Sequence, residues 1–367
     1  MESPKFGIVT QGYVRKGEDE RQRVREVILE AQAAERYGFD SFGMSEQHFK
    51  FPTNTTGALD VLFPWIAATT ERIRLMPAAV ITPLHHPLNI AERWATIDVL
   101  SGGRVDFAVG RGNTPPTFAA FEIDPAETNA RTFEALEIIY KAWNSREPFS
   151  HHGEFWNFDA VRLTPYPLQS PPPAPSLASV SLKSCRMAGE HRLGWMGVTN
   201  NIEWHQIQAQ FDAYREGWEN GAEIPGTPPN SKITIVSPMH VARTSKEARD
   251  QVEFGTMEYA KRSMKQQNLN QQLTYGTSEG TMGTTGQFFD GEFDELLERT
   301  PLAIGDPDYV IEKLLKLAEY GMDEIGLAID YATHEELVEN IRLAGEEVIP
   351  AVRQELAARE ARLAVAK

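Results

Sequence analysis

The strongest constraint on the fold is an alternation that runs along the whole chain, in which short apolar segments are followed by longer segments with helical periodicity. Apolar runs of this length are typical of strands that are buried on both faces, as in parallel sheets. Eight such units in succession predict an α/β fold, a (β/α)8 TIM barrel with insertions in the strand-to-helix loops. The eight expected strands span residues 5–11, 39–45, 73–82, 104–110, 175–180, 194–198, 232–242 and 322–329.

An open, doubly wound sheet is the alternative fold for the same alternation. The first strand-to-helix junction reads GIVTQGYVRKG and lacks the G-x-G-x-x-G turn of dinucleotide-binding sheets, which favours the barrel. The length of 367 residues exceeds the usual domain of about 100–200 residues, but barrels commonly reach that length as one unit. We therefore expect residues 1–367 to form a single domain.

Two segments interrupt the alternation. Residues 145–175 are rich in proline, histidine and aromatic residues and end in SPPPAP, so we expect an irregular insertion there. The region around 266–290 is polar and rich in glycine and threonine. It is consistent with either a mobile lid over a site or a disordered insertion.

Charge and apolar content restrict the partners. The formal net charge of −16 disfavours general binding to nucleic acid or to an anionic membrane, because both require a basic surface. No uninterrupted apolar stretch approaches the roughly 18 residues of a membrane span. The N-terminus does not resemble a secretory signal, and the single Cys185 cannot form an intrachain disulfide, so a cytoplasmic location is expected.

Polar residues that follow strands should gather at one mouth of the barrel, where barrel enzymes carry their sites. Arg111 follows a strand between two glycines, and Ser181 precedes a short helix with Ser184 three residues later. Together they predict a clamp for a phosphate dianion, whereas separately they would be a surface arginine and an ordinary helix cap. His240, at the end of another strand, is also expected at the mouth.

The segment SEQHF places Glu46, Gln47 and His48 directly after the second strand. With the adjacent His85 and His86, an imidazole–carboxylate metal site is conceivable, but the spacing matches no zinc motif and we expect no metal. G-x-S-x-G, Walker and Cys–His nucleophile motifs are also absent from the sequence.

With these motifs together, the chain resembles the bacterial-luciferase-like family of flavin-dependent monooxygenases, from Phe6 to about Arg353. The resemblance rests on SEQHF, PAAVITPLHHPLNIAERWATID, SGGRVDFAVGRGN, FSHHGEFW with PYPLQSPPPAP, and SVSLKS with AGEHRLGWM. It implies a barrel, usually dimeric, that binds reduced FMN at the strand ends. It also implies a cis peptide at Ala78–Ala79 beneath the flavin, and phosphate contacts from Arg111, Asn113, Ser181 and Ser184.

The resemblance further implies the reaction. Reduced FMN, delivered by a separate NAD(P)H-dependent flavin reductase, would react with O2 to form a flavin hydroperoxide that oxygenates a small organic substrate. Glu46, Gln47 and His48 are the catalytic candidates. The chain would act as a homodimer.

Gln47 departs from the luciferase pattern, in which the corresponding residue is the catalytic histidine. Glutamine forms hydrogen bonds but cannot serve as a general base near neutral pH, so luminescence with long-chain aldehydes is not expected. Two alternatives to the monooxygenase remain open: an F420-dependent oxidoreductase on the same fold, and a flavin-binding relative without turnover.

Overall fold

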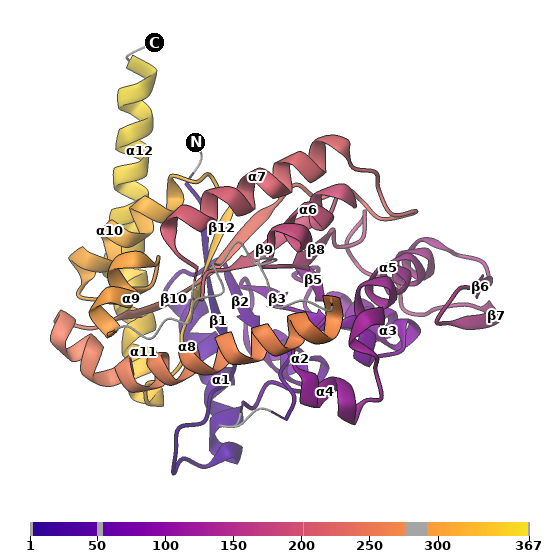
Figure 1. Cartoon of the computed structure of the whole chain (residues 1–367), viewed down its shortest axis with the longest axis horizontal. Coiled ribbons are helices and arrows are strands. Elements are labelled where there is room, and N and C mark those ends of the chain that lie inside the picture. The colour runs from indigo at the N-terminus through magenta and orange to yellow at the C-terminus, as the bar shows by residue number, and fades with distance from the viewer. Residues whose placement is uncertain (1–2, 50–53, 201, 276–291, 366–367) are drawn as a thin grey trace.

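The computed structural model describes residues 3–49, 54–200, 202–275 and 292–365. All eight expected strands form, and they lie parallel in one sheet at the centre of the molecule (Figure 1). A ninth short strand, β11, extends this sheet beside β10, and β6 and β7 form a separate hairpin. The strands are β1 Lys5–Thr10, β2 Ser41–Met44, β3 Arg74–Pro77, β4 Val80–Ile81, β5 Phe107–Gly110, β6 Phe149–His152, β7 Asn157–Val161, β8 Pro175–Ala178, β9 Gly194–Val198, β10 Ile233–Val241, β11 Ala303–Gly305 and β12 Glu324–Ala328.

The sheet closes through its third strand, which is divided into β3 and β4. The strand order is β3-β2-β1-β12-β10-β9-β8-β5-β4, so the two halves of one chain segment occupy the two ends of the sheet. β3 pairs with β2, whereas β4 pairs with β5. The predicted (β/α)8 barrel is thereby confirmed, and the open sheet is excluded.

Helices surround the barrel, and their apolar faces pack on the outward side chains of the strands, such as Phe6, Phe107 and Trp195. The C-terminal helix α12 projects well beyond the body (Figure 1). The helices are α1 Glu20–Arg36, α2 Leu59–Thr69, α3 Pro87–Leu100, α4 Pro115–Ala120, α5 Thr128–Asn144, α6 Leu182–Glu190, α7 Trp204–Asn220, α8 Ser245–Tyr275, α9 Phe293–Arg299, α10 Pro307–Ala318, α11 His334–Leu343 and α12 Ile349–Val365, with short helical turns at Thr82–Leu84, Pro125–Glu127 and Ala344–Val348.

A charged layer fills the barrel at the N-terminal ends of its strands. The Arg74 guanidinium lies 2.6 Å from Asp106, and the Lys232 ammonium lies 3.3 Å from Asp106 and 2.6 Å from Glu324. Ser41 Oγ donates a further hydrogen bond to the Glu324 carboxylate. Each charge has an opposite partner, as burial of ions requires.

An apolar layer lies above the charged one. It consists of side chains that alternate with the outward-facing residues along the same strands, as the two-residue period of a strand dictates. Its buried members are Val9, Met76, Ala79, Ala108, Met196 and Val236. The barrel is therefore filled through its lower half.

One expectation about the interrupting segments was wrong, and the other falls mostly outside the described residues. Residues 145–175 are not irregular throughout, because Phe149–His152 and Asn157–Val161 pair as an antiparallel hairpin. Phe149 and His151 alternate inward, a strand period that the surrounding prolines obscured. Residues 266–275, the start of the segment expected to be either a mobile lid or a disordered insertion, continue helix α8, and the rest of that segment, 276–290, lies outside the described residues.

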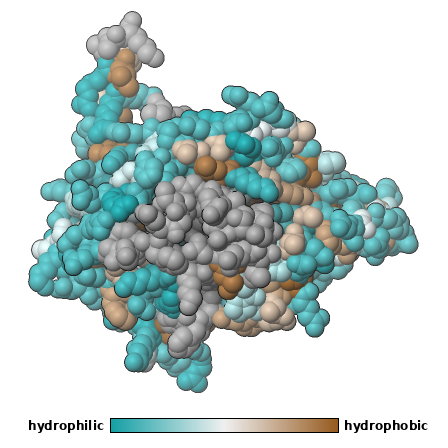
Figure 2. Space-filling model, viewed as in Figure 1, coloured by the Kyte–Doolittle hydropathy of each residue, from teal (hydrophilic) through white to brown (hydrophobic). Residues whose placement is uncertain are grey.

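The surface agrees with the acidic composition. Hydrophilic residues cover most of the coloured surface on the face shown in Figure 2. Among the described residues, none of the helices combines the length and apolar character needed to cross a membrane.

The charged layer predicts a large cost for Asp106→Asn. Burial opposes ionisation of Asp106, but the charges of Lys232 and Arg74 hold its pKa below the ordinary value. Loss of the carboxylate leaves two cations inside the barrel, and we expect the free energy of unfolding to fall by about 3 kcal/mol. Urea unfolding at neutral pH measures this change.

The matched control is Asp250→Asn, which removes the partner of Lys246 from an exposed pair on α8. Its effect should stay below about 0.5 kcal/mol. Equal losses in the two variants would contradict a role of the charged layer in stability.

Candidate active site

The C-terminal ends of the strands form a mouth whose floor consists of small apolar side chains. Ala78, Ala178, Val198 and Ala328 pack on the apolar layer yet remain partly exposed, although most of their strand neighbours are buried. Exposure of alternate residues at these strand ends means that they face the open end of the barrel. None of the side chains of this floor is larger than valine.

Glu46 connects three elements at the edge of this floor. Its Oε1 lies 2.8 Å from His48 Nε2 and 2.7 Å from His85 Nε2, and its Oε2 accepts a 2.8 Å hydrogen bond from the Ile81 amide. The residue is 6% exposed. The carboxylate thus joins the loop after β2 to β4 and to the turn that follows it.

The environment of Glu46 favours its ionised form. Burial alone would raise the pKa of Glu46, but hydrogen bonds from His48 and His85, with that from the Ile81 amide, hold it below the ordinary value. The carboxylate is consequently an acceptor of hydrogen bonds from all three groups at neutral pH.

The Glu46–His48–His85 cluster has the composition of a metal site, with its ligand atoms within 4.8 Å of one another. Its nitrogen–oxygen separations of 2.7 and 2.8 Å are hydrogen-bond lengths. Two ligands on one tetrahedral zinc would stand about 3.3 Å apart, given bonds of about 2.0–2.1 Å. The expectation of no metal stays a prediction.

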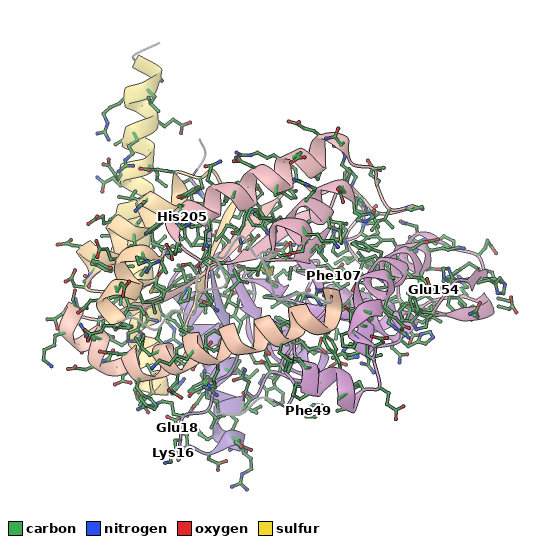
Figure 3. The ribbon with its side chains drawn as sticks, in the orientation of Figure 1. Lys16, Glu18, Phe49, Phe107, Glu154 and His205 are labelled. Atoms are coloured by element: carbon green, nitrogen blue, oxygen red, sulfur yellow. The ribbon has the colours of Figure 1, made fainter. Side chains whose placement is uncertain are left out.

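Aromatic rings flank His48 on the outer side. The Phe49 and Phe121 rings stack with their centroids 5.9 Å apart, and each lies within 6 Å of the imidazole. Figure 3 shows Phe49 beside α4, at the periphery of the molecule. Gln47, between Glu46 and His48, is partly buried, and its backbone N–H donates a hydrogen bond to the Thr56 carbonyl.

The Ala78–Ala79 peptide is cis, as the resemblance implied. It lies between β3 and β4, where Ala78 belongs to the floor and the buried Ala79 to the apolar layer beneath it. Gly112, in the loop after β5, has a φ of 81°, and a Cβ at this position would come within 2.9 Å of Ile81. Glycine is therefore required for the chain to pass this close to the mouth.

Two of the residues expected to bind a phosphate, Ser181 and Ser184, lie together at the start of α6. Ser181 is the N-cap of α6, as predicted, and its Oγ accepts the Ser184 amide at 3.1 Å. The two hydroxyls lie 2.8 Å apart. Strands β5 and β8 pair side by side, so the loops that carry Arg111 and Ser181 leave the barrel next to each other, and Asn113 is exposed in the first of them.

His240 is not at the mouth, contrary to expectation. It lies inside β10, opposite Ile304 of β11, and is 2% exposed with its Nε2 2.5 Å from Gln251. Pairing with β11 extends β10 beyond the length of its neighbours, and this extension buries the histidine.

Asp330, after β12, is a mouth residue that sequence reasoning missed. Its carboxylate accepts hydrogen bonds from Thr10 Oγ1 and from the amides of Gln11 and Tyr13, at 3.0–3.3 Å. It therefore fastens the loop after β1 to the end of the last strand. The signal in the sequence was an acidic residue directly after an apolar strand.

A family model described as luciferase-like monooxygenase matches residues 4–324 of the chain. Among solved structures, the monooxygenase RslO1 from Streptomyces bottropensis superposes with a TM-score of 0.77 at 25% identity, covering 95% of this chain and 99% of that one.

Two curated relatives show how far the sequence similarity extends. The uncharacterized protein y4wF of Sinorhizobium fredii is 33% identical over 158 residues, which are 43% of this chain and less than half, 46%, of that protein. The 4-hydroxyprotoasukamycin monooxygenase of Streptomyces nodosus subsp. asukaensis is 26% identical over 263 residues, 71% of this chain and 70% of that protein.

Two further relatives differ in the cofactor that their names give. The oxygenase component of the flavin-dependent trigonelline monooxygenase of Acinetobacter baylyi is 29% identical over 157 residues, 42% of each chain. The F420-dependent hydroxymycolic acid dehydrogenase of Mycobacterium tuberculosis is 27% identical over 221 residues, 58% of each chain.

The contacts of Asp330 predict a dependence of stability on pH. Burial raises the pKa of Asp330 to about 6, from 3.8, although the charge of Arg23 opposes the shift. Because the folded-state pKa lies above the ordinary one, this group favours folding most below about pH 4 and loses that contribution as the pH rises through about 6. The stability advantage of the wild type over Asp330→Asn should therefore shrink between pH 5 and pH 8, as measured by urea unfolding.

Asp212→Asn, on the exposed side of α7, is the control and should leave the difference from wild type unchanged between these pH values. If instead the wild type becomes more stable relative to Asp330→Asn as the pH rises, the folded protein stabilises Asp330 as an anion, and the prediction is wrong.

Proposed function

Because the chain belongs to the luciferase-like monooxygenase family, we propose that it is a single-domain, FMN-dependent monooxygenase that uses reduced FMN and O2 to oxygenate a small organic substrate. The observation that carries the proposal is the floor of small side chains with the Glu46–His48–His85 cluster at its edge. This arrangement combines an apolar platform for a planar ring with groups that hold and accept protons. Ligand sites of this kind are expected at the strand ends of a barrel.

The residues at the mouth fit an isoalloxazine ring. Ala78, Ala178 and Ala328 leave space above the apolar layer that larger side chains would occupy. Gly110 adds to this space, since even a Cβ there would only reach van der Waals contact with Ala79 and Ala178, at 3.6 Å. The ring would rest on this floor, where its apolar faces are removed from water.

The phosphate of FMN would lie at the start of α6. Ser181 and Ser184 offer hydroxyls, and the first amides of the helix point toward an anion at this position. Arg111 and the backbone near Asn113 come from the adjacent loop and would complete the clamp. This assignment of the four residues is part of the proposal.

Bound reduced FMN would supply the electrons that activate O2. The chain would then orient the substrate and limit the access of water. Phe49 and Phe121 form an apolar wall beside His48, and Gln47 can hold a polar group of the substrate without exchanging a proton. His48, anchored by Glu46, is the imidazole of this segment that can accept a proton.

A deazaflavin is the second candidate cofactor. It is favoured by the similarity to the F420-dependent dehydrogenase of Mycobacterium tuberculosis, and the reaction would then be hydride transfer. The replacement of the expected histidine by Gln47 is the feature that favours the third candidate, a flavin-binding protein without turnover.

The proposal includes two protein partners. The similarity to an oxygenase component supports a separate NAD(P)H-dependent flavin reductase. A second copy of the chain would cover the exposed side chains of α2 and α3, where Val61, Trp65 and Leu100 are 66%, 65% and 62% exposed. A cytoplasmic location agrees with such a reductase.

Anaerobic titration tests the cofactor. We expect reduced FMN to bind more tightly than F420, and Arg111→Ala to weaken FMN binding by roughly 10- to 100-fold, as expected for loss of a charge-assisted contact. Riboflavin, which lacks the phosphate, should bind equally well to both proteins. Arg186→Ala, on the same helix as Ser184 but paired with Glu216, is the control.

Equal losses of FMN and riboflavin in Arg111→Ala would refute the clamp, and selective F420 binding would favour hydride transfer. Addition of isotope-labelled O2 with panels of aldehydes, ketones, sulfonates and terpenes then tests oxygenation. FMN binding without label in any product would favour the non-catalytic alternative.

The exposed apolar residues of α2 predict that Trp65→Asp converts the expected dimer into a monomer, because a charge would replace buried apolar area at the interface. Light scattering after size exclusion measures the mass. Phe254→Asp, at an 80% exposed position on α8, is the control and should leave the dimer intact. A Trp65→Asp protein that remains dimeric would place the interface elsewhere.

A further inference from the structure

One carboxylate oxygen in this site forms hydrogen bonds with two imidazoles. Glu46 Oε1 lies within 2.8 Å of both His48 Nε2 and His85 Nε2, while Oε2 is occupied by the Ile81 amide. An ionised carboxylate can only accept hydrogen bonds. Both imidazoles must therefore carry a hydrogen on Nε2.

The tautomer follows from these contacts. In a neutral imidazole only one nitrogen carries hydrogen, so a ring that donates through Nε2 presents an unprotonated Nδ1. Glu46 imposes this state on His48 and His85 alike. Both side chains are partly exposed, at 16% and 25%, while that of Glu46 is 3% exposed.

We propose that Glu46 holds His48 and His85 as a matched pair in the Nε2–H tautomer, and that His85 is a second proton acceptor at the mouth, replacing the imidazole absent at position 47. The proposal rests on the proposed function for its chemical use, since the proton would come from the substrate. The pairing itself rests on the contacts of Glu46. His85 reaches the cluster from the turn after β4, 39 residues away in sequence.

Among the described residues, Glu46 is the charged group that is hydrogen-bonded to both imidazoles. Of the segments against His48, residues 54–57 and helix α4 carry no ionisable side chain, and neither does the turn Thr82–Leu84 before His85. Next to His48 Nδ1 stands Gly57, whose added Cβ would touch this atom at 3.4 Å. A side chain at this position would therefore pack directly on the accepting nitrogen.

The path of the proton can be followed from the substrate to the solvent. A substrate hydroxyl or an acidic C–H would give its proton to Nδ1, which forms an imidazolium that still donates through Nε2 to Glu46. The Glu46 carboxylate stabilises the new positive charge. The proton then leaves to water from the exposed part of the ring, and the neutral tautomer is restored.

His86 provides an internal comparison. It is adjacent to His85, but its Nδ1 already accepts the Leu88 amide at 3.2 Å as the N-cap of α3. That nitrogen is committed to the helix. Asparagine is an equally good cap, so His86→Asn should preserve the fold.

Nitrogen-15 NMR of the histidine rings in the ligand-free chain tests the pairing. We expect both His48 and His85 to show hydrogen on Nε2 at pH 8. In Glu46→Gln the amide oxygen can still accept from Ile81, but its NH2 group then faces the imidazoles and requires an acceptor, so at least one ring should switch to Nδ1–H. Hydrogen on Nδ1 of either ring in the wild type, or an unchanged pattern in Glu46→Gln, would overturn the proposal.

His85→Gln separates anchoring from proton transfer. The glutamine amide can still donate to Glu46 but offers no basic nitrogen. We expect kcat for oxygenation to fall at least about tenfold, less than the roughly 100-fold or more that a sole general base contributes because His48 remains, with unchanged KM and FMN affinity. His86→Asn should retain wild-type kcat, and a His85→Gln enzyme with wild-type kcat would overturn the role of His85.

Failure of the proposed function looks different. It would appear as absence of oxygenation in the wild type, whatever residue stands at position 85. The NMR experiment needs no cofactor or substrate, so it still decides whether Glu46 pairs the two imidazoles.

Discussion

Closure of the barrel depends on the third strand, which has to pair with a different neighbour on each half of its length. β3 pairs with β2 and β4 pairs with β5; of the two residues between them, Ala78 lies in the floor of the mouth and Ala79 in the apolar layer beneath it. The segment that completes the sheet therefore also supplies part of the surface on which a ligand would rest. Any change that displaced these two residues would affect both.

Glu46 adds a second link at the same place. Its hydrogen bond to the Ile81 amide fastens the loop after β2 to β4, directly beyond the break. The carboxylate that orients two imidazoles is thus also a fastening between adjacent strands. A buried carboxylate is costly unless its oxygens accept hydrogen bonds, and here three donors bond to the two oxygens of Glu46.

The sequence was sufficient for the barrel because strands buried on both faces appear as uninterrupted apolar runs. It also located Ser181 as a helix cap and placed Glu46 and His48 at a strand end. It could not reveal the contact between Glu46 and His85, because that contact depends on which strands become neighbours and in what register. Asp330 was missed for the same reason, since its partners Thr10 and Gln11 lie at the opposite end of the chain.

The wrong prediction for residues 145–175 and the incomplete one for residues 266–275 have a local cause. Prolines around residues 149–161 concealed a short alternation that is visible at Phe149 and His151, and the polar composition of 266–275 concealed the continuation of α8. The composition of a segment indicates how exposed it is to solvent, whereas strand pairing and the continuation of a helix depend on the elements that pack against the segment.

The filled lower half of the barrel has a consequence for the order in which ligands bind and dissociate. The ion pairs around Asp106 and the apolar layer above them fill the barrel interior below the floor, so a ligand can reach the floor only from the C-terminal ends of the strands. A ligand that lies on the floor therefore has to bind before a ligand that lies above it, and it can dissociate only after the upper ligand has left. Geometry of this kind imposes an order on arrivals and departures before any side chain takes part in the chemistry.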